Sequence, residues 1–369
     1  MSIRLDKYTL LLLASLILFF PRGKFMTHEP FLVWKLEKKN PALQPIPALY
    51  RKKTGRLRKN HFSSGSTFTF FSNNTRVISS YSVPPGFFVT AGSGEAGAIL
   101  YSNDRDKISF IDKVKGTTWD FKTYAYPFLL QNNGIIFLIT GENGGYGMLD
   151  INGNELAKPV SSGMFITTFD IATATNLVLM GYADGYAKLF DQKLNELWFR
   201  KFTDSNIRIV KKVSLSVSGK YAAVLAGLEK EYLYLLDRSG DIILKHRTKE
   251  GRRRSIALIF SADERSLLEE SDQGFRLYST EHRNLIMEKK IFPRSAGRRI
   301  ISMDLSADGR FIIMATRLSA DISRIDLYDR EGTLYYKLLF ENENPLVLFS
   351  RDKDNFLIET KENIYLYGF

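Results

Sequence analysis

A short segment with apolar residues at alternate positions, ending at an acidic turn, recurs along this chain of 369 residues. Its clearest copy, Tyr186–Asp191, reads YAKLFD. The copies end at Asp112, Asp150, Asp191, Asp237, Ser279, Asp329 and Tyr367. Alternation with a period of two predicts β-strands, and the interval of 38 to 50 residues suits four short strands per repeat. Because 44% of the residues are hydrophobic, the chain can give such an array of small sheets a core.

The unit around Tyr186–Asp191 shows the plan of the repeat. Its first two strands are predicted at Phe165–Ile171 and Leu177–Tyr182, and its outer strand at Glu196–Lys201. The turn Ala183–Gly185 contains the Asp-Gly pair that favours a tight hairpin. Asp191 is expected to make a turn rather than to act chemically, because equivalent positions hold Ser and Gly.

The turns between the first and second strands of each unit share a second pattern. They read LSVSGKYAAVL from position 215, FSADERSLL from 260 and LSADGRFIIMA from 305. Ser and Asp can bond their own backbone amides there, and Gly lets the chain turn. These repeats resemble those of the WD40-like and PQQ-like β-propeller superfamily over residues 66–369. The Trp-Asp signature of strict WD40 blades is missing, since Trp119-Asp120 falls on a predicted outer strand.

The resemblance implies a single all-β propeller of seven four-stranded blades over residues 66–369. The last unit, within residues 346–367, lacks a fourth strand. Ser66–Phe71 or Arg76–Ser82 is expected to supply that outer strand and close the ring, which leaves no unpaired edge. Eight blades is the alternative, if the hairpin Thr67–Ser82 belongs to another partial blade.

The N-terminal segment predicts an association with a membrane. Tyr8–Phe20 carries no charge and follows Arg4 and Lys7, as in a secretory signal. Residues 1–24 are therefore predicted to be a helical signal-anchor or a cleaved signal peptide; a buried apolar segment of a soluble fold is the remaining alternative. Residues 25–65, which are basic and contain several prolines, are predicted to be a tether.

The side of the membrane is predicted from the charges around this segment. A short basic N-terminal flank is the usual layout for export, whereas Arg22, Lys24 and Lys35 downstream favour a cytoplasmic body under the positive-inside rule. We expect residues 8–20 to lie in the cell inner membrane and the propeller to be periplasmic.

The residue types restrict the chemistry of the chain. There is no cysteine, and the four histidines, His28, His61, His246 and His282, show no metal-ligand spacing. Glycine-rich stretches such as Gly92–Gly97 are not followed by the helix that a phosphate loop needs. The sequence therefore predicts no catalytic residue, no metal site, no bound cofactor and no enzyme activity.

A basic cluster is the one candidate binding site. The net charge is +12, and two loops expected side by side on neighbouring blades are rich in arginine. Their arginines are Arg252, Arg253, Arg254, Arg294, Arg298 and Arg299. Arginine forms forked bonds to carboxylate and phosphate, so these residues are predicted to bind an anionic partner. The loops lack the interleaved aromatic residues of a nucleic-acid site, which argues against nucleic acid.

These observations predict a non-catalytic protein-interaction scaffold of the bacterial-type cell envelope. The superfamily that the repeats resemble includes scaffolds of envelope assembly complexes, which implies other proteins of such a complex as partners. Two alternatives stay open: a ligand-binding or enzymatic propeller with a site in the central funnel, and a membrane-tethered scaffold that faces the cytoplasm.

Overall fold

The computed structural model describes most of the chain beyond residue 60 and one segment before it. The described ranges are 31–37, 61–64, 66–71, 77–91, 97–102, 106–129, 134–141, 143–248, 257–291, 299–341, 343–349 and 355–368. Within them the regular structure is all strand, and no helix long and apolar enough to cross a membrane is present. The predicted helix over residues 8–20 lies outside the described residues.

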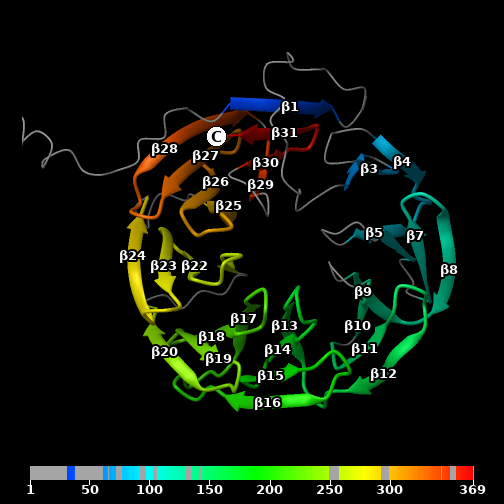
Figure 1. Ribbon diagram of the computed structural model, residues 1–369, viewed down its shortest axis with the longest axis horizontal. Helices are drawn as coiled ribbons and strands as arrows, with labels where there is room; N and C mark the ends of the chain where they lie inside the picture. The colour runs from blue at the N-terminus through cyan, green and yellow to red at the C-terminus, as the bar shows by residue number, and fades with distance from the viewer. Residues whose placement is uncertain are drawn as a thin grey trace, which may run out of the picture.

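The described strands form eight antiparallel sheets, which follow one another around a ring (Figure 1). We call them blades 1 to 8. Blade 1 contains β2 (His61–Ser64), β3 (Thr67–Phe71) and β4 (Val77–Ser82). Blade 2 contains β5 (Phe87–Ala91), β6 (Ala98–Ser102), β7 (Lys107–Asp112) and β8 (Gly116–Lys122). Blade 3 contains β9 (Ala125–Leu129), β10 (Ile136–Thr140), β11 (Gly145–Leu149) and β12 (Glu155–Ser161). Blade 4 contains β13 (Ile166–Ile171), β14 (Val178–Tyr182), β15 (Tyr186–Phe190) and β16 (Glu196–Lys201).

The second half of the ring repeats this order. Blade 5 contains β17 (Val210–Leu215), β18 (Tyr221–Ala226), β19 (Tyr232–Asp237) and β20 (Ile242–Arg247). Blade 6 contains β21 (Leu258–Phe260), β22 (Ser266–Ser271), β23 (Gly274–Ser279) and β24 (Asn284–Lys290). Blade 7 contains β25 (Arg299–Leu305), β26 (Phe311–Arg317), β27 (Ile322–Asp329) and β28 (Leu334–Glu341). Blade 8 contains β29 (Leu346–Phe349), β30 (Phe356–Glu359), β31 (Asn363–Gly368) and β1 (Phe31–Glu37). The predicted all-β repeat architecture is confirmed.

Closure of the ring differs from the prediction. Neither Ser66–Phe71 nor Arg76–Ser82 joins the last blade, because β3 and β4 pair with each other in a sheet of their own. The outer strand of blade 8 is β1, which runs antiparallel to β31 with Leu36 opposite Ile364. The described sheets therefore correspond to the alternative count of eight.

The prediction of a tether is wrong for Phe31–Glu37, which forms β1. The apolar run FLVW in this segment favours a strand, but the basic, proline-containing sequence that follows it led to the prediction of a tether for the whole of residues 25–65.

Hydrophobic clusters join each blade to the next. Between blades 4 and 5, for example, Leu179 and Leu189 pack with Val213 and Val224, all fully buried. The outer strands instead alternate, so that in β16 the side chains of Leu197 and Phe199 are exposed and Trp198 is partly buried. The second and third strands of the blades thus form the core of the ring, and the outer strands cover it.

The outer strands share a device that protects them as sheet edges. In each of the seven four-stranded blades the outer strand meets its neighbour with at least one break in register. β12 has two such breaks and also contains Pro159. Bulges and proline discourage further strand pairing, so the rim of the ring is poorly suited to edge-to-edge association.

Tight turns occupy one face of the ring, which we call the turn face. The turns between first and second strands and those between third and fourth strands emerge there. Asp191 illustrates them: its Oδ1 accepts hydrogen bonds from the backbone N–H groups of Lys193 (2.8 Å) and Asn195 (2.9 Å). Asp150 makes the same pair of bonds to Asn152 and Asn154. The predicted role of these acids as turn formers is confirmed.

The turn face also clasps neighbouring blades together. The turn glycine of one blade lies against the outer strand of the blade before it, so that a Cβ at Gly153 would lie 3.0 Å from Trp119 and one at Gly240 2.9 Å from Trp198. Both glycines have a positive φ, 86° and 85°, which favours glycine. The indole N–H of Trp119 completes its clasp by donating to the carbonyl of Ile151 at 2.7 Å.

Candidate functional site

The opposite face of the ring, which we call the entry face, carries the loops that differ from blade to blade. They are the loops between second and third strands and those that lead from the outer strand of one blade to the inner strand of the next. The inner strands β9, β13 and β17 begin at this face and border the centre of the ring (Figure 1). A site on the entry face beside the centre of the ring can therefore draw residues from these inner strands and from the loops around them.

Polar residues on the inner strands hold the next blade in place. The carboxylate of Asp170 on β13 accepts a hydrogen bond from the N–H of Leu215 on β17 at 2.7 Å. Asp304 on β25 accepts the equivalent bond from Phe349 on β29, also at 2.7 Å. Burial raises the pKa of Asp170, and the bond from Leu215 only partly opposes this. Because both acids are committed to blade contacts, we assign them a structural role.

A cavity of about 350 Å³ lies where the inner strands of blades 3 and 4 meet. It is lined by Tyr126, Phe128, Ile139, Asn143, Ile166, Thr167, Thr168, Phe169 and Lys212. These residues come from the start of β9, the end of β10, the loop after it, β13 and β17. The cavity therefore opens at the entry face, beside the centre of the ring.

Aromatic rings form one wall of this cavity. The ring of Phe128 lies 4.8 Å from that of Phe169 at 73°, an edge-to-face arrangement, and Phe137 lies 5.1 Å from Phe169. β9 alternates, with Ala125 and Leu129 buried but Phe128 36% exposed. A phenyl ring left exposed on an inner strand keeps part of its surface available to a ligand.

A cationic group lies on the other side of the cavity. Lys212 is half-buried on β17, and its ammonium makes no direct hydrogen bond or salt bridge with the described residues, although its charge favours the ionised form of Asp170. Its neighbour Lys211 differs, because its ammonium lies 2.7 Å from the carboxylate of the fully buried Glu231. Two adjacent lysines thus have different roles, one within the core of blade 5 and one beside the cavity.

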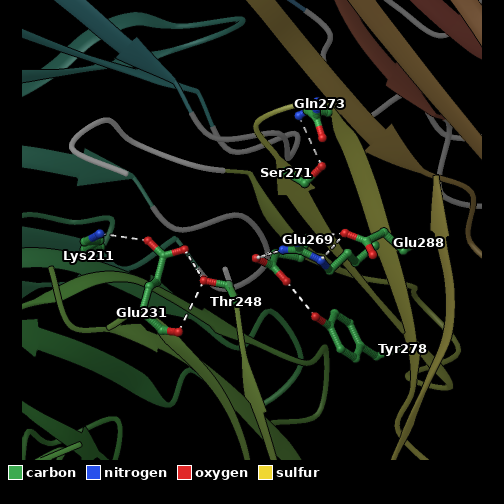
Figure 2. A network of polar contacts seen from close by, with 9 residues as sticks. Lys211, Glu231, Thr248, Glu269, Ser271, Gln273, Tyr278 and Glu288 are labelled. Carbon is green, nitrogen blue, oxygen red and sulfur yellow. Dashed lines mark hydrogen bonds and ion pairs between the residues drawn. The ribbon is translucent and has the colours of Figure 1, made fainter. Parts of the chain in front are cut away.

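Buried polar contacts form one group around Glu231 in blade 5 and another around Glu269 in blade 6 (Figure 2). Glu231 also accepts a hydrogen bond of 2.7 Å from the hydroxyl of Thr248. In blade 6 the carboxylate of Glu269 accepts bonds from the hydroxyl of Tyr278 (2.7 Å) and the guanidinium of Arg276 (3.2 Å). The sequence contained a signal for this network, because SLLEES in β22 places acids where the equivalent strand YAAVLA has apolar residues.

The predicted arginine site falls largely outside the described residues. Arg252, Arg253, Arg254, Arg294 and Arg298 all lie there. Arg299 is exposed at the start of β25, opposite Arg317 on β26. The first loop begins and ends beside buried glutamates, since Thr248 bonds Glu231 and the N–H of Ala257 donates to Glu270 at 3.0 Å. The grouping of the six arginines stays a prediction.

Histidine and metal chemistry are not evident in the described part of the chain. Within it, no group of three or more His, Cys, Asp or Glu side chains is arranged to hold a metal ion. The ring of His246 lies 5.5 Å from that of Tyr278, and the backbone N–H of His282 donates to the hydroxyl of Ser279 within a turn. Neither histidine lines the cavity.

Exposed apolar side chains lie on the entry face, three of them at the start of the blades that line the cavity and one across the ring in blade 8. Tyr124 is 77% exposed before β9, Phe165 52% before β13 and Ile207 46% before β17. Leu346, at the start of β29, is 38% exposed. We call these four residues the apolar rim. Single apolar residues outside a periodic pattern carry no signal in the sequence, so these four residues were not predicted.

Comparisons with known proteins agree with this architecture. A family model described as a beta-propeller protein matches residues 7–318. No curated protein matches the chain. Among solved structures, BamB from Moraxella catarrhalis has a TM-score of 0.64 at 12% identity and covers 92% of this chain and 100% of its own. KlHsv2 with loop 6CD replaced by a Gly-Ser linker has a TM-score of 0.52 at 14% identity and covers 74% of this chain and 91% of its own. At such identities the likeness concerns the fold alone.

Proposed function

Because the chain belongs to the family of β-propeller proteins, we propose that it is a non-catalytic scaffold that docks another protein on its entry face. The apolar rim is the observation that carries this proposal. The loops that lead into blades 3, 4 and 5 and the first strand of blade 8 each expose a large apolar side chain at this face. Exposed apolar residues grouped in this way are typical of protein interaction sites, where aromatic residues are enriched.

The turn face offers no comparable group of residues. Its exposed large apolar residues lie at the outer strands, away from the centre of the ring, among them Val114 before β8, Ile242 at the start of β20 and Leu334 at the start of β28. Acids such as Asp150 and Asp191 are bonded to their own turns. The polar residues that repeat from blade to blade on the turn face thus have a structural role. The partner is expected to contact the face whose loops are specific to each blade.

The cell envelope is the proposed location of the scaffold. The uncharged run Tyr8–Phe20 after Arg4 and Lys7 supports insertion into the inner membrane, with the propeller on the periplasmic side. A fusion of alkaline phosphatase to the C-terminus tests this placement. Phosphatase activity of this fusion supports export of the propeller. If the phosphatase fusion is inactive and a fusion to a reporter that works only in the cytoplasm is active, the propeller faces the cytoplasm instead.

Crosslinking followed by purification from membranes tests the docking face. The double substitution Tyr124→Ser and Phe165→Ser removes half of the apolar rim, while Val114→Ser and Phe199→Ser remove exposed apolar groups from the turn face and the outer strand β16. We expect the wild-type protein and the control pair to recover the same partner, and the rim variant to lose it. Equal recovery by the rim variant would overturn the proposal.

A further inference from the structure

We propose that the cavity at the inner strands of blades 3 and 4 is a binding site for an aromatic group that carries a carboxylate. The ligand is either a free aryl carboxylic acid or the aromatic C-terminal residue of a peptide, because both present the same chemistry. The proposal does not depend on the docking of a partner through the apolar rim. It rests on the volume of the cavity, its aromatic wall and the cationic group beside it.

The aromatic wall selects a ring. Phe128 and Phe169 already meet edge to face at 4.8 Å, and Phe128 keeps 36% of its surface exposed. A third ring can add to this arrangement with its centroid about 4.5–7 Å from its neighbours, a geometry that stabilises aromatic groups beyond simple burial. An aliphatic ligand would gain burial but not these ring contacts.

The charge of the cavity selects an anion. Lys212 is half-buried and has no hydrogen-bond or ion-pair partner among the described residues, and no acidic residue lines the cavity. Asp170 is the acid whose ionisation Lys212 favours, but its carboxylate accepts the bond from Leu215. A ligand carboxylate inside the cavity would give the Lys212 ammonium an anionic partner that, unlike Asp170, is not already bonded to the next strand.

Neutral donors can complete the recognition of the carboxylate. Asn143 and Thr168 line the cavity, and their side chains make no hydrogen bond with the described residues. Asn143 is held in place through its backbone, whose N–H donates to Thr140 and whose carbonyl accepts from Ile166. Its amide and the Thr168 hydroxyl each have a donor to offer. Together with Lys212 they provide three donors for the two carboxylate oxygens.

The volume of the cavity limits the ligand. About 350 Å³ lies at the lower end of the range of roughly 300–1,000 Å³ that small-molecule sites occupy. One ring with a short acidic chain fits this space, whereas a dinucleotide or an extended oligomer does not.

Titration of the full-length protein with matched probes tests the charge. Phenylacetate has the ring and the carboxylate, 2-phenylethylamine has the ring with a cation, and acetate lacks the ring. Ligand-observed NMR should show saturable binding of phenylacetate, with the amine and acetate at least about tenfold weaker, which corresponds to about 1.4 kcal/mol. Equal binding of phenylacetate and the amine, or no saturable binding of phenylacetate, would overturn the proposal.

Charge reversal at Lys212 sharpens the test. Lys212→Glu should weaken phenylacetate about tenfold and reverse the preference in favour of the amine. Lys158→Glu makes the same change in net charge on the exposed outer strand β12 and should leave both affinities unchanged. If Lys212→Glu behaves like Lys158→Glu, the cavity does not use this lysine and the proposal fails.

A peptide comparison distinguishes the two sources of the ligand. N-acetyl-Gly-Phe is offered with a free C-terminal carboxylate and as the C-terminal amide. Tighter binding of the free acid than of phenylacetate identifies a peptide terminus, and tighter binding of phenylacetate identifies a free aryl acid. The Tyr124→Ser, Phe165→Ser protein is expected to bind phenylacetate with unchanged affinity, which separates this proposal from partner docking.

Discussion

On the turn face, Asp150 accepts hydrogen bonds from the backbone of Asn152 and from the backbone and side chain of Asn154, all at 2.8 Å. On the entry face, Lys212 and the side chains of Asn143 and Thr168 have no such partners among the described residues. The first set of polar groups is used up in holding a turn. The second set keeps its hydrogen-bonding capacity and lies beside exposed aromatic rings.

The two faces therefore differ in role: the turn face carries the features that repeat from blade to blade, and the entry face carries the groups that are available to a ligand. A turn that satisfies its own acid can be copied from blade to blade, because the hydrogen bonds to that acid come from within the turn. A loop with spare donors and exposed apolar groups is stable only if the strands beneath it are held firmly. In this protein the buried ion pair joins Lys211, next to Lys212 on β17, to Glu231 just before β19, so a buried ionic contact lies beneath the entry face.

We expect the largest loss of stability when the buried ion pair beneath the entry face is broken. Lys211→Met leaves the carboxylate of Glu231, which is fully buried, without this cation, and the free energy of unfolding should fall by about 3–5 kcal/mol. Urea unfolding measures it. Lys188→Met is the control, because its partner Glu196 is 37% exposed and the loss should be at most about 1 kcal/mol.

A double substitution keeps this test decisive if Lys211→Met folds poorly. Lys211→Met combined with Glu231→Gln removes the buried charge and should recover part of the lost stability. If the double variant is no more stable than Lys211→Met, or if Lys211→Met and Lys188→Met cost the same, the buried pair does not support the entry face.

The next largest loss of stability is expected when the contact between a turn glycine and the tryptophan of the neighbouring blade is disturbed. Gly240→Ala would force a Cβ into the indole of Trp198 at a positive φ, and we expect a loss of about 2–4 kcal/mol in the free energy of unfolding. Gly86→Ala is the matched control on the entry face, since its φ is 80° but nothing lies within 4 Å of the added Cβ. It should cost about 1 kcal/mol. Thermal and urea unfolding would show no difference between the two if the clasp is unimportant.

The two clasping tryptophans give a smaller and more specific comparison. Trp119 donates to the carbonyl of Ile151, whereas the buried indole N–H of Trp198 has no partner among the described residues. Both Phe substitutions remove the same volume, so Trp119→Phe should be more destabilising than Trp198→Phe by about 1 kcal/mol. Equal losses in urea unfolding would mean that the bond to Ile151 adds nothing.

The turn face was predictable from the sequence, and the candidate site was not. Asp191 and its equivalents recur at a regular interval and act within a few residues, so local chemistry is enough to assign them. Lys212 and Phe128 line the same cavity only because the inner strands β9, β13 and β17 of three consecutive blades begin at the same face. Closure by Phe31–Glu37 was missed for a similar reason, because pairing with β31 joins the two ends of the described chain.

The smallest expected effect tests whether the acids of the turn face are purely architectural. Partial burial favours the neutral form of Asp191, but bonds from the side chain and backbone of Asn195 and the backbone of Lys193 outweigh it, and the pKa of Asp191 is lowered. A lowered pKa means that Asp191 stabilises the fold when it is ionised. This contribution is present above the pKa of the unfolded chain, about 3.9, and is lost as the pH falls below it.

Asp191→Ala should therefore lower the free energy of unfolding by about 1 kcal/mol near neutral pH, and the difference from wild type should shrink as the pH falls from about 5 to about 3. Urea unfolding at several pH values measures this change. The same variant should bind phenylacetate as the wild type does, because the turn lies on the face opposite the cavity. A loss of binding with unchanged stability would contradict the division between the two faces, since it would give a repeated turn acid a part in recognition.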